Sequence, residues 1–446
     1  MVCLFLLVDN MTEYRIESIA LKNIGVFDEV KIDFPPIEST EADQKKAEIH
    51  LFTGANGCGK STLLYALASI FDKYPADNDL LAKRFRQDDY AVININFNKE
   101  LIRFNQKTDV RLHLVKEYYF EQSKILGLYH HIKQNISLID TCLAPIMAFA
   151  YSGRRTLENI STHSIENIQK SPFENALSFT GNTDTNLIAQ WILNSLSSAA
   201  LAEVEGDKQA AQNYQYAVKQ IEEFIFDICQ LEIKFKIQRS PLTVKISLNN
   251  RVLDFEVLPD GLKSVISWVA DLAVRLDSIP WAQQRSIFDQ NIILFLDEID
   301  IHLHPKWQRR ILPAVQKLLP NAQIFASTHS PFVVGSVEDA WIYKLPEQGE
   351  KVSEIKAIKS NPAKSYALIL NEIFDIDKDF GEEIEQDLNQ FYQYRQSYMN
   401  NKQPADKTQL LAIAAKLFDK GEEVKAIVAR ELRQLSRLMN EDIDLA

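Results

Sequence analysis

The sequence of 446 residues predicts an α/β protein with a mixed sheet, an antiparallel β subdomain, a helical insertion and a C-terminal helical segment. An apolar strand, a glycine-rich loop and an apolar helix follow one another in "IHLFTGANGCGKSTLLYALASIF", residues 49–71. Residues 90–115 alternate between apolar and polar side chains, as antiparallel strands do. The apolar run "NIILFLDE", residues 291–298, is typical of a buried parallel strand.

Composition excludes some classes of protein. A formal net charge of -12 argues against a protein that coats nucleic acid non-specifically, because that binding needs a broad basic surface; a local basic groove stays open. Hydrophobic residues make up 46% of the chain, enough for a globular core. Cys3, Cys58, Cys142 and Cys229 form no CxxC pair, so we expect neither a disulfide framework nor a zinc site, and a cytoplasmic protein.

The N-terminus opens with "MVCLFLLVDN", whose apolar run of about seven residues is far shorter than the roughly 20 of a membrane span. It also lacks the basic start and small-residue cleavage site of a signal peptide. We therefore expect no membrane association. Because Met11 begins a strand-like segment, residues 1–10 are predicted to be a tail or a start-site extension.

The remaining elements follow in order. Strand patterns in residues 14–34 precede the glycine loop, and a mostly helical stretch of residues 171–231 sustains no heptad repeat. Strands return in residues 233–248, an amphipathic helix begins near residue 260, and charged, glutamine-rich helix dominates beyond residue 345. We expect a tail (1–10), an N-lobe with the glycine loop and the antiparallel strands (11–155), a helical insertion or lid (156–232), a C-lobe (233–345) and a C-terminal helical region (346–446) that is either a partner-docking surface or a solvated bundle.

The glycine loop "GANGCGKS", residues 54–61, matches the P-loop pattern and has the strand and helix that this pattern requires on either side. Its backbone N–H groups would wrap phosphate oxygens. Lys60 would reach the β- and γ-phosphates, Ser61 would ligate Mg²⁺, and Thr62 would hydrogen-bond the α-phosphate. The predicted ligands are ATP and Mg²⁺, held by Gly54, Asn56, Gly57, Gly59, Lys60, Ser61 and Thr62.

Two acidic residues end the apolar strand before residue 299. Asp297 would hold Mg²⁺, and Glu298 would act as the general base that orients the attacking water. His329 in "ASTHSPF" follows the next apolar strand and could contact the γ-phosphate, although a lone histidine after a strand is more often structural. His302 and His304 are two residues apart in a proline-containing loop, so we assign them no metal.

Together, "GANGCGKST", "FLDEIDIHLHP" and "STHSP" resemble the ABC-type P-loop ATPases, in the branch of SMC, RecF and the overcoming-lysogenization-defect nucleases, over residues 14–345. The overall layout is most similar to the PtuA ATPase subunits of Septu anti-phage systems, which also occur in some retron systems. The resemblance implies an ATPase that forms a homodimer or higher homo-oligomer around ATP and is not itself a nuclease. It also implies a separate HNH nuclease partner (PtuB-like) and, in retron systems, a reverse transcriptase with its RNA/DNA product.

The family also implies a role for "LPDGLKS", residues 258–264, at the start of the amphipathic helix. In ABC ATPases a serine-glycine signature there binds the γ-phosphate held by the other chain. Gly261 would supply its N–H and Lys263 its charge. Asp260 replaces the serine and would repel phosphate unless it caps the helix. A plain Asp-Gly turn is the alternative.

The sequence also differs from the ABC-type ATPase pattern at a second position, and two other functions stay open. At the position of the family's Q-loop glutamine the chain has "YSGRR", where Arg154 and Arg155 could contact nucleotide, a partner or nucleic acid, or form a solvated turn. A RecF-like DNA-binding repair ATPase is a second function. A third is an overcoming-lysogenization-defect-type ATPase-nuclease, for which "DIDKD", residues 375–379, follows a helix and not the expected strand.

Overall fold

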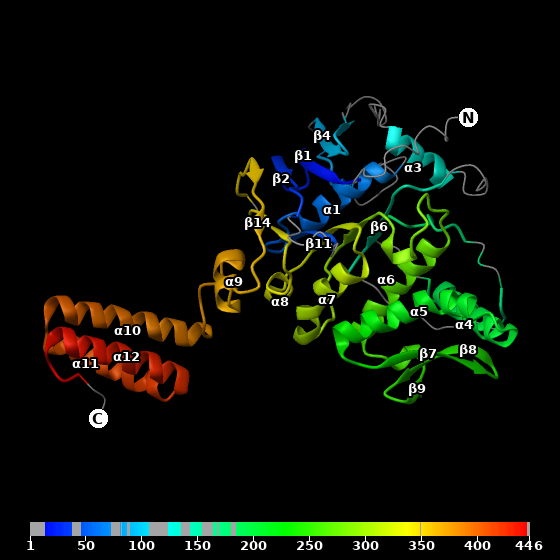
Figure 1. Ribbon diagram of the computed structural model, residues 1–446. Coiled ribbons are helices and arrows are strands. Elements are labelled where there is room, and N and C mark those ends of the chain that lie inside the picture. The colour runs from blue at the N-terminus through cyan, green and yellow to red at the C-terminus, as the bar shows by residue number, and fades with distance from the viewer. Residues whose placement is uncertain are drawn as a thin grey trace. The chain divides into compact units, whose positions relative to one another are not determined.

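The structure is a computed structural model that describes residues 14–37, 46–72, 81, 83–86, 90–106, 124–134, 143–153, 164–166, 168, 170–179, 184–347 and 349–443 (Figure 1). The chain forms two compact units, the first ending at Ile369 and the second beginning at Leu370. The predicted tail 1–10 lies outside the described residues, as do Arg154 and Arg155.

A six-stranded sheet forms the centre of the first unit, in the order β14-β12-β3-β11-β10-β6. Neighbouring strands from β12 to β6 are parallel, and β14 is antiparallel to β12. The residues of β6, β10 and β11 are all buried, which explains the unbroken apolar sequences of β6 and β10; β11 also buries the polar Gln323 and Ser327. The strands are β3 (Glu48–Thr53), β6 (Met147–Tyr151), β10 (Ile292–Leu296), β11 (Ala322–Ser327), β12 (Trp341–Lys344) and β14 (Ile358–Lys359).

A second sheet has the order β13-β2-β1-β4-β5, and all its pairings except β13 with β2 are antiparallel. The alternation in residues 90–106 therefore does mark antiparallel strands, and the rest of the predicted stretch, residues 107–115, lies outside the described residues. Phe34, just after β2, is 1% exposed, and its ring lies 5.0 Å from that of Phe325 on β11, so the two sheets share one core. The strands are β1 (Ile16–Ile24), β2 (Phe27–Asp33), β4 (Ala91–Phe97), β5 (Glu100–Gln106) and β13 (Glu354–Ile355).

The helical insertion is a hairpin of α4 (Thr185–Glu205) and α5 (Lys208–Cys229). Asp184 and Asp207 cap the two helices by accepting the N–H groups of Leu187 and Ala210. Gly206 ends α4 in a left-handed conformation. By length and composition α4 could cross a membrane, but it packs on α5 and buries Ile188, Trp191 and Ile192 in the protein. Figure 1 shows this hairpin beside the third sheet, β7 (Ile233–Arg239), β8 (Leu242–Leu248) and β9 (Arg251–Leu253).

The other helices of the first unit connect or cover the strands. Helix α1 begins directly after the glycine loop, α6 precedes β10, and α7 lies between β10 and β11. Their bounds, with those of the short helical turns, are α1 (Lys60–Ala68), η2 (Ser69–Phe71), α3 (Lys124–Gln134), η4 (Phe255–Val257), α6 (Asp260–Asp277), η5 (Ile287–Asp289), α7 (Pro305–Leu318) and α8 (Pro331–Val334).

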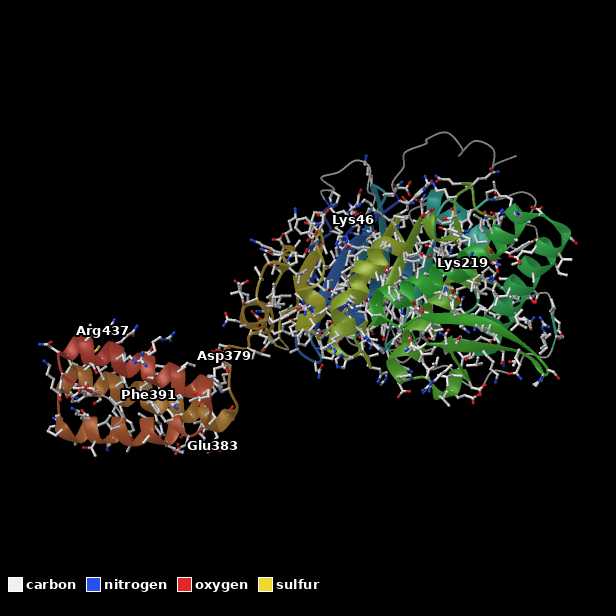
Figure 2. The ribbon with its side chains drawn as sticks, turned by 60° about the horizontal axis from the view of Figure 1, so that its bottom comes forward. Lys46, Lys219, Asp379, Glu383, Phe391 and Arg437 are labelled. Atoms are coloured by element: carbon white, nitrogen blue, oxygen red, sulfur yellow. The ribbon has the colours of Figure 1, made fainter. Side chains whose placement is uncertain are left out.

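The second unit is a three-helix bundle that follows α9 (Tyr366–Phe374). Its helices are α10 (Glu382–Asn401), α11 (Pro404–Phe418) and α12 (Glu422–Met439). Phe391 of α10 is fully buried, and Figure 2 shows it among the three helices. Leu410 of α11 and Val428 and Leu432 of α12 pack in the same core, so the bundle has a hydrophobic core of its own.

Candidate functional site: a P-loop beside an acidic strand end

The glycine loop between β3 and α1 depends on backbone conformations that side chains rarely adopt. Gly54, Gly57 and Gly59 have φ angles of 146°, 81° and 102°. A Cβ atom at Gly59 would also lie 2.6 Å from Cζ of Phe27, because the turn between β1 and β2 packs against the loop. Glycine is therefore required here for both backbone conformation and space.

Lys60, the first residue of α1, turns its side chain back into this loop. Its Nζ donates to the carbonyl oxygens of Gly54 and Ala55, each at 2.9 Å, and the residue is only 6% exposed. Burial lowers the pKa of Lys60, and the charges of Asp297 and Glu298 oppose that shift. A buried ammonium held mainly by neutral carbonyls fits an added polyphosphate, which would supply negative charge next to it.

The acidic pair lies beyond β10, between the ends of β6 and β11. Asp297 donates its N–H to the carbonyl of Tyr151 at 2.9 Å, and its Oδ1 accepts the hydroxyl of Ser327 at 2.6 Å. The same hydroxyl oxygen accepts the N–H of Glu298 at 2.7 Å. One serine on β11 thus fixes both members of the pair, and Asp297 is only 6% exposed.

Glu298 occupies a strained position. Its φ is 48°, in the left-handed region that a non-glycine residue adopts at a cost. A Cβ atom at Gly153 would lie 2.7 Å from both Cβ and Oε2 of Glu298, so glycine at 153 makes room for this carboxylate. The hydrogen bond from its N–H to Ser327 and the close packing against Gly153 hold Glu298 in this conformation despite its cost.

His329 follows β11 and lies near the charged groups of the loop and of the acidic pair. Burial lowers the pKa of His329; the charge of Lys60 lowers it further, while Asp300 and Asp297 oppose the shift. The imidazole is therefore neutral at pH 7. Its neighbour Thr328 is anchored on both sides, since its N–H donates to the carbonyl of Phe52 at 3.1 Å and its hydroxyl to Oδ1 of Asp300 at 2.6 Å.

The predicted Mg²⁺ ligands Ser61 and Asp297 lie around a common neighbour, Tyr65. Burial and then the charge of Asp297 raise the pKa of Tyr65 to about 12, while the neighbouring Ser61 opposes this shift. A serine hydroxyl and a carboxylate are oxygen ligands of the kind that Mg²⁺ takes from proteins in phosphate sites. These residues fit the metal, which would neutralise phosphate charge there when bound.

Sequence reasoning missed several residues of this site. The Nε of Arg84 donates to Oγ1 of Thr62 at 3.0 Å, and its guanidinium lies 4.7 Å from the centroid of the Tyr65 ring. Ser327 and Gly153 were missed as well. Ser327 stands two residues before His329 in "ASTHS", and Gly153 is in "YSGRR", so both belong to stretches already singled out. Arg84 had no comparable signal.

The structure places Asp260 at the first position of α6, after the N-cap residue Pro259, and gives the helix no side-chain cap. The interpretation that Asp260 could cap the helix is therefore wrong. Its side chain is 80% exposed, with Oδ1 3.6 Å from Nζ of Lys263. Within the described part of the chain, the N–H groups of Asp260 and Gly261 have no acceptor.

Gly261 is needed by the chain's own packing. A Cβ atom there would lie 2.5 Å from the carbonyl oxygen of His302 and 3.2 Å from Cζ3 of Trp307. His302 itself has a φ of 61°, and Nδ1 of His304 accepts the N–H of Lys306 at 3.2 Å as the N-cap of α7. The two histidines thus have structural roles in the turn that packs against α6.

Comparison with known proteins places the chain in a family. A family model described as "AAA domain" matches residues 18–241, and a second, described as "AAA domain, putative AbiEii toxin, Type IV TA system", matches residues 158–335. The Retron Ec83 probable ATPase of Escherichia coli is 26% identical over 418 residues, which cover 78% of this chain and 74% of that protein. The Septu protein PtuA of Bacillus thuringiensis is 28% identical over 210 residues, 42% of this chain and 53% of that protein. Among solved structures, the SMC head domain from Thermotoga maritima matches with a TM-score of 0.39 and 14% identity, over 77% of this chain and 99% of that one.

Proposed function

Because the chain belongs to the AAA-domain family and is an ABC-type ATPase related to the retron and Septu ATPases, we propose that it binds and hydrolyses ATP as the ATPase subunit of an anti-phage defence system. The observation that carries this proposal is the meeting of the P-loop lysine, the acidic pair and His329 at the carboxyl ends of β3, β10 and β11. Ligands of open parallel sheets bind at this edge.

The residues divide the chemistry among them. The loop N–H groups and Lys60 bind the phosphates, and Ser61 and Asp297 hold Mg²⁺. Glu298 orients water and accepts its proton as the water attacks the γ-phosphorus and the bond to ADP breaks. The neutral His329 contacts the γ-phosphate oxygens, so its hydrogen bond is lost when phosphate leaves.

We propose that two chains complete each ATP site. The N-terminus of α6 supports this arrangement, because the N–H groups of Asp260 and Gly261 are without acceptors in the described residues and Lys263 adds a positive charge beside them. Asp260 is paired with Lys263, which offsets the repulsion that its carboxylate would exert on phosphate. ATP bound to the P-loop of one chain would then meet α6 of the other.

A complementation experiment tests the shared site. Lys60→Ala disables a chain's P-loop, and Lys263→Glu reverses the charge at its α6. We expect each variant alone to lose ATPase activity, while Lys263→Glu still binds ATP through Lys60. A mixture contains heterodimers with both lesions in one site and an intact second site, so part of the activity should return. If mixing restores nothing, although both variants fold and exchange chains, the two-chain site is wrong.

We further propose that the ATPase restrains or releases a separate effector: a PtuB-like HNH nuclease, joined in a retron system by a reverse transcriptase with its RNA/DNA product. The names of the relatives support membership of such systems. Native co-purification should recover the nuclease with the ATPase, and Lys60→Ala should abolish protection in a phage-plating assay. DNA binding by the isolated ATPase, with no nuclease recovered and no effect on plating, would favour a RecF-like repair role instead.

A further inference from the structure

Gln308, in the first turn of α7, connects the turn that follows the acidic pair to the segment that follows β11. Side chains on a helix lean toward its N-terminus, so Gln308 reaches back over the residues that precede α7. Its Nε2 donates to the carbonyl oxygens of Asp300 at 3.2 Å and of Leu303 at 3.0 Å, and its Oε1 accepts the hydroxyl of Ser330 at 2.8 Å. A single amide thus holds two segments of the candidate site together.

The orientation of this amide is fixed by the groups around it. Both carbonyl oxygens only accept hydrogen bonds, so they face the N–H donors of the amide, and the hydroxyl of Ser330 donates to its oxygen. The same hydroxyl oxygen accepts the N–H groups of Phe332 and Val333 at 3.1 and 3.3 Å, and Ser330 is only 5% exposed. A shift of Ser330 would therefore break hydrogen bonds to α7 and within α8.

His329 lies between two residues that are both bound to the segment from Asp300 to Gln308. On one side Thr328, which is fully buried, donates its hydroxyl to Oδ1 of Asp300 at 2.6 Å. On the other side Ser330 donates to Gln308. The ring of His329 itself has no hydrogen-bond partner among the described residues. The anchored neighbours therefore determine where the ring lies.

We propose that Gln308 is a positioning residue for ATP hydrolysis, which holds His329 at the γ-phosphate by way of Ser330. The inference rests on the proposed function, in which His329 contacts the γ-phosphate and Glu298 orients the attacking water. Glu298 lies two residues before Asp300, so the same amide links the turn after the base to the segment that carries the histidine. Gln308 itself needs no contact with the nucleotide for this role.

The alternative is that Gln308 only stabilises the fold, and α7 contains a matched residue for that comparison. Gln316, eight residues further along α7, also donates through Nε2 to two backbone carbonyls, those of Ala47 and Glu338, each at 3.3 Å. These partners precede β3 and β12, at the opposite edge of the central sheet from the candidate site. Loss of the Gln316 amide should therefore destabilise the fold without reaching the site.

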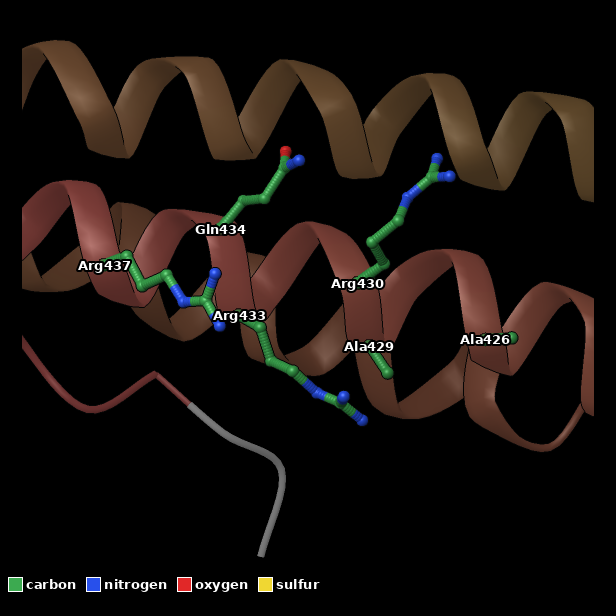
Figure 3. Close-up of a pocket in the computed structure, with 6 residues that line it drawn as sticks. All are labelled: Ala426, Ala429, Arg430, Arg433, Gln434 and Arg437. Atoms are coloured by element: carbon green, nitrogen blue, oxygen red, sulfur yellow. The ribbon is translucent and has the colours of Figure 1, made fainter.

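Replacement by methionine keeps the length of the side chain and removes its hydrogen bonds. Gln308→Met should lower kcat by roughly 10- to 100-fold, as expected for a reacting group misplaced by about 1 Å. In a Glu298→Gln background, which slows turnover, the ratio of ATP to ADP affinity in equilibrium dialysis should fall about tenfold, because the hydrogen bond to the γ-phosphate is lost. Gln316→Met should keep the parental kcat and affinity ratio. So should Arg433→Met, in the groove of α12 in the second unit that Figure 3 shows.

The decisive comparison uses His329→Ala. If Gln308 acts through this histidine, Gln308→Met should change neither kcat nor the affinity ratio any further in the His329→Ala protein. Ser330→Ala cuts the same link from the other side and should reproduce the losses of Gln308→Met, so it decides the question by the same measurements where Gln308→Met does not fold.

The possible outcomes separate this inference from the proposed function. If Gln308→Met keeps the parental kcat and affinity ratio, or lowers them as much again in His329→Ala, the positioning role is overturned while the proposed function stands. Losses of the same size in Gln316→Met would overturn it too, because they would show a general effect of stability. A parental kcat in His329→Ala would instead refute the proposed role of the histidine, and this inference with it.

Discussion

Two explanations exist for a glycine at position 261: the packing of α6 within its own chain, and the close approach of a nucleotide to the backbone. Substitution of Gly261 by alanine distinguishes them. If the glycine serves the chain's own packing, the added Cβ meets the carbonyl oxygen of His302 at 2.5 Å, a distance that real Cβ contacts do not reach. That oxygen belongs to the backbone of a turn in which His302 already has a φ of 61°, so it cannot swing aside as a side chain would.

The magnitude follows from two opposing effects. Overpacking of this kind costs about 1–3 kcal/mol, whereas glycine to alanine inside a helix gains about 0.5–1 kcal/mol. The difference between the two effects gives an expected destabilisation of the first unit of up to about 2.5 kcal/mol for Gly261→Ala. Gly127→Ala is the matched control: Gly127 lies inside α3, and a Cβ there meets nothing within 4 Å, so this substitution should be neutral or stabilising.

Differential scanning fluorimetry, which measures stability, and equilibrium dialysis, which measures ATP binding, distinguish a packing role of Gly261 from a nucleotide-binding role. The melting temperature of Gly261→Ala should fall by a few degrees below that of Gly127→Ala, and ATP should still bind at low temperature through Lys60. A Gly261→Ala protein that is as stable as the parent but has lost hydrolysis would refute the packing argument. Gly261 would then be a glycine because a nucleotide approaches its backbone.

Three further substitutions test the site itself. Lys60→Ala removes the cation in the glycine loop and should abolish tight ATP binding in equilibrium dialysis; unchanged affinity would contradict the P-loop assignment. Glu298→Gln should keep ATP binding, slow phosphate release by roughly 10²- to 10⁴-fold and trap an ATP-bound dimer visible by light scattering; a parental turnover rate would exclude Glu298 as the base. Ser327→Ala removes the hydroxyl that accepts the N–H of Glu298 and donates to Oδ1 of Asp297. It should cost about 1–3 kcal/mol in a denaturation experiment and lower kcat more than ATP affinity.

The sequence predicts the candidate site most accurately where the functional residues lie in one short stretch. The glycines and Lys60 are contiguous, so their pattern fixes both the left-handed backbone and the position of the ammonium. Asp297 and His329 could be placed near them because parallel strands of one sheet end at the same edge. No such rule exists for Arg84, whose contact with Thr62 joins residues 22 positions apart in the chain.

The predictions from sequence fail where a helix begins one residue away from the expected position. They are incomplete where residues distant in sequence become neighbours in the fold. The idea that Asp260 caps α6 fails because Pro259 is the last extended residue, so the helix begins one position earlier than a cap at Asp260 requires. The need for glycine at 153 and 261 comes from Glu298 and His302, which lie far along the chain. A pattern in the local sequence cannot show that a distant backbone or carboxylate occupies the space of a Cβ atom.

One buried network joins the two parts of the proposed site. The carbonyl of Tyr151 accepts the N–H of Asp297, and its hydroxyl donates to Asp271 of α6 at 2.8 Å. Arg275, one turn further along α6, donates to the same carboxylate at 2.6 Å and to the carbonyl of Pro172 at 2.7 Å. Asp271 is only 1% exposed, and a buried charge that loses one partner is strongly destabilising, so α6 cannot shift without carrying the end of β6 with it. The helix that presents Asp260 and Gly261 at its N-terminus is thus tied, three turns later, to the strand end that holds Asp297. On the proposed two-chain arrangement, a phosphate of the partner that pulls on α6 acts on the acidic pair of this chain through hydrogen bonds that the fold already contains.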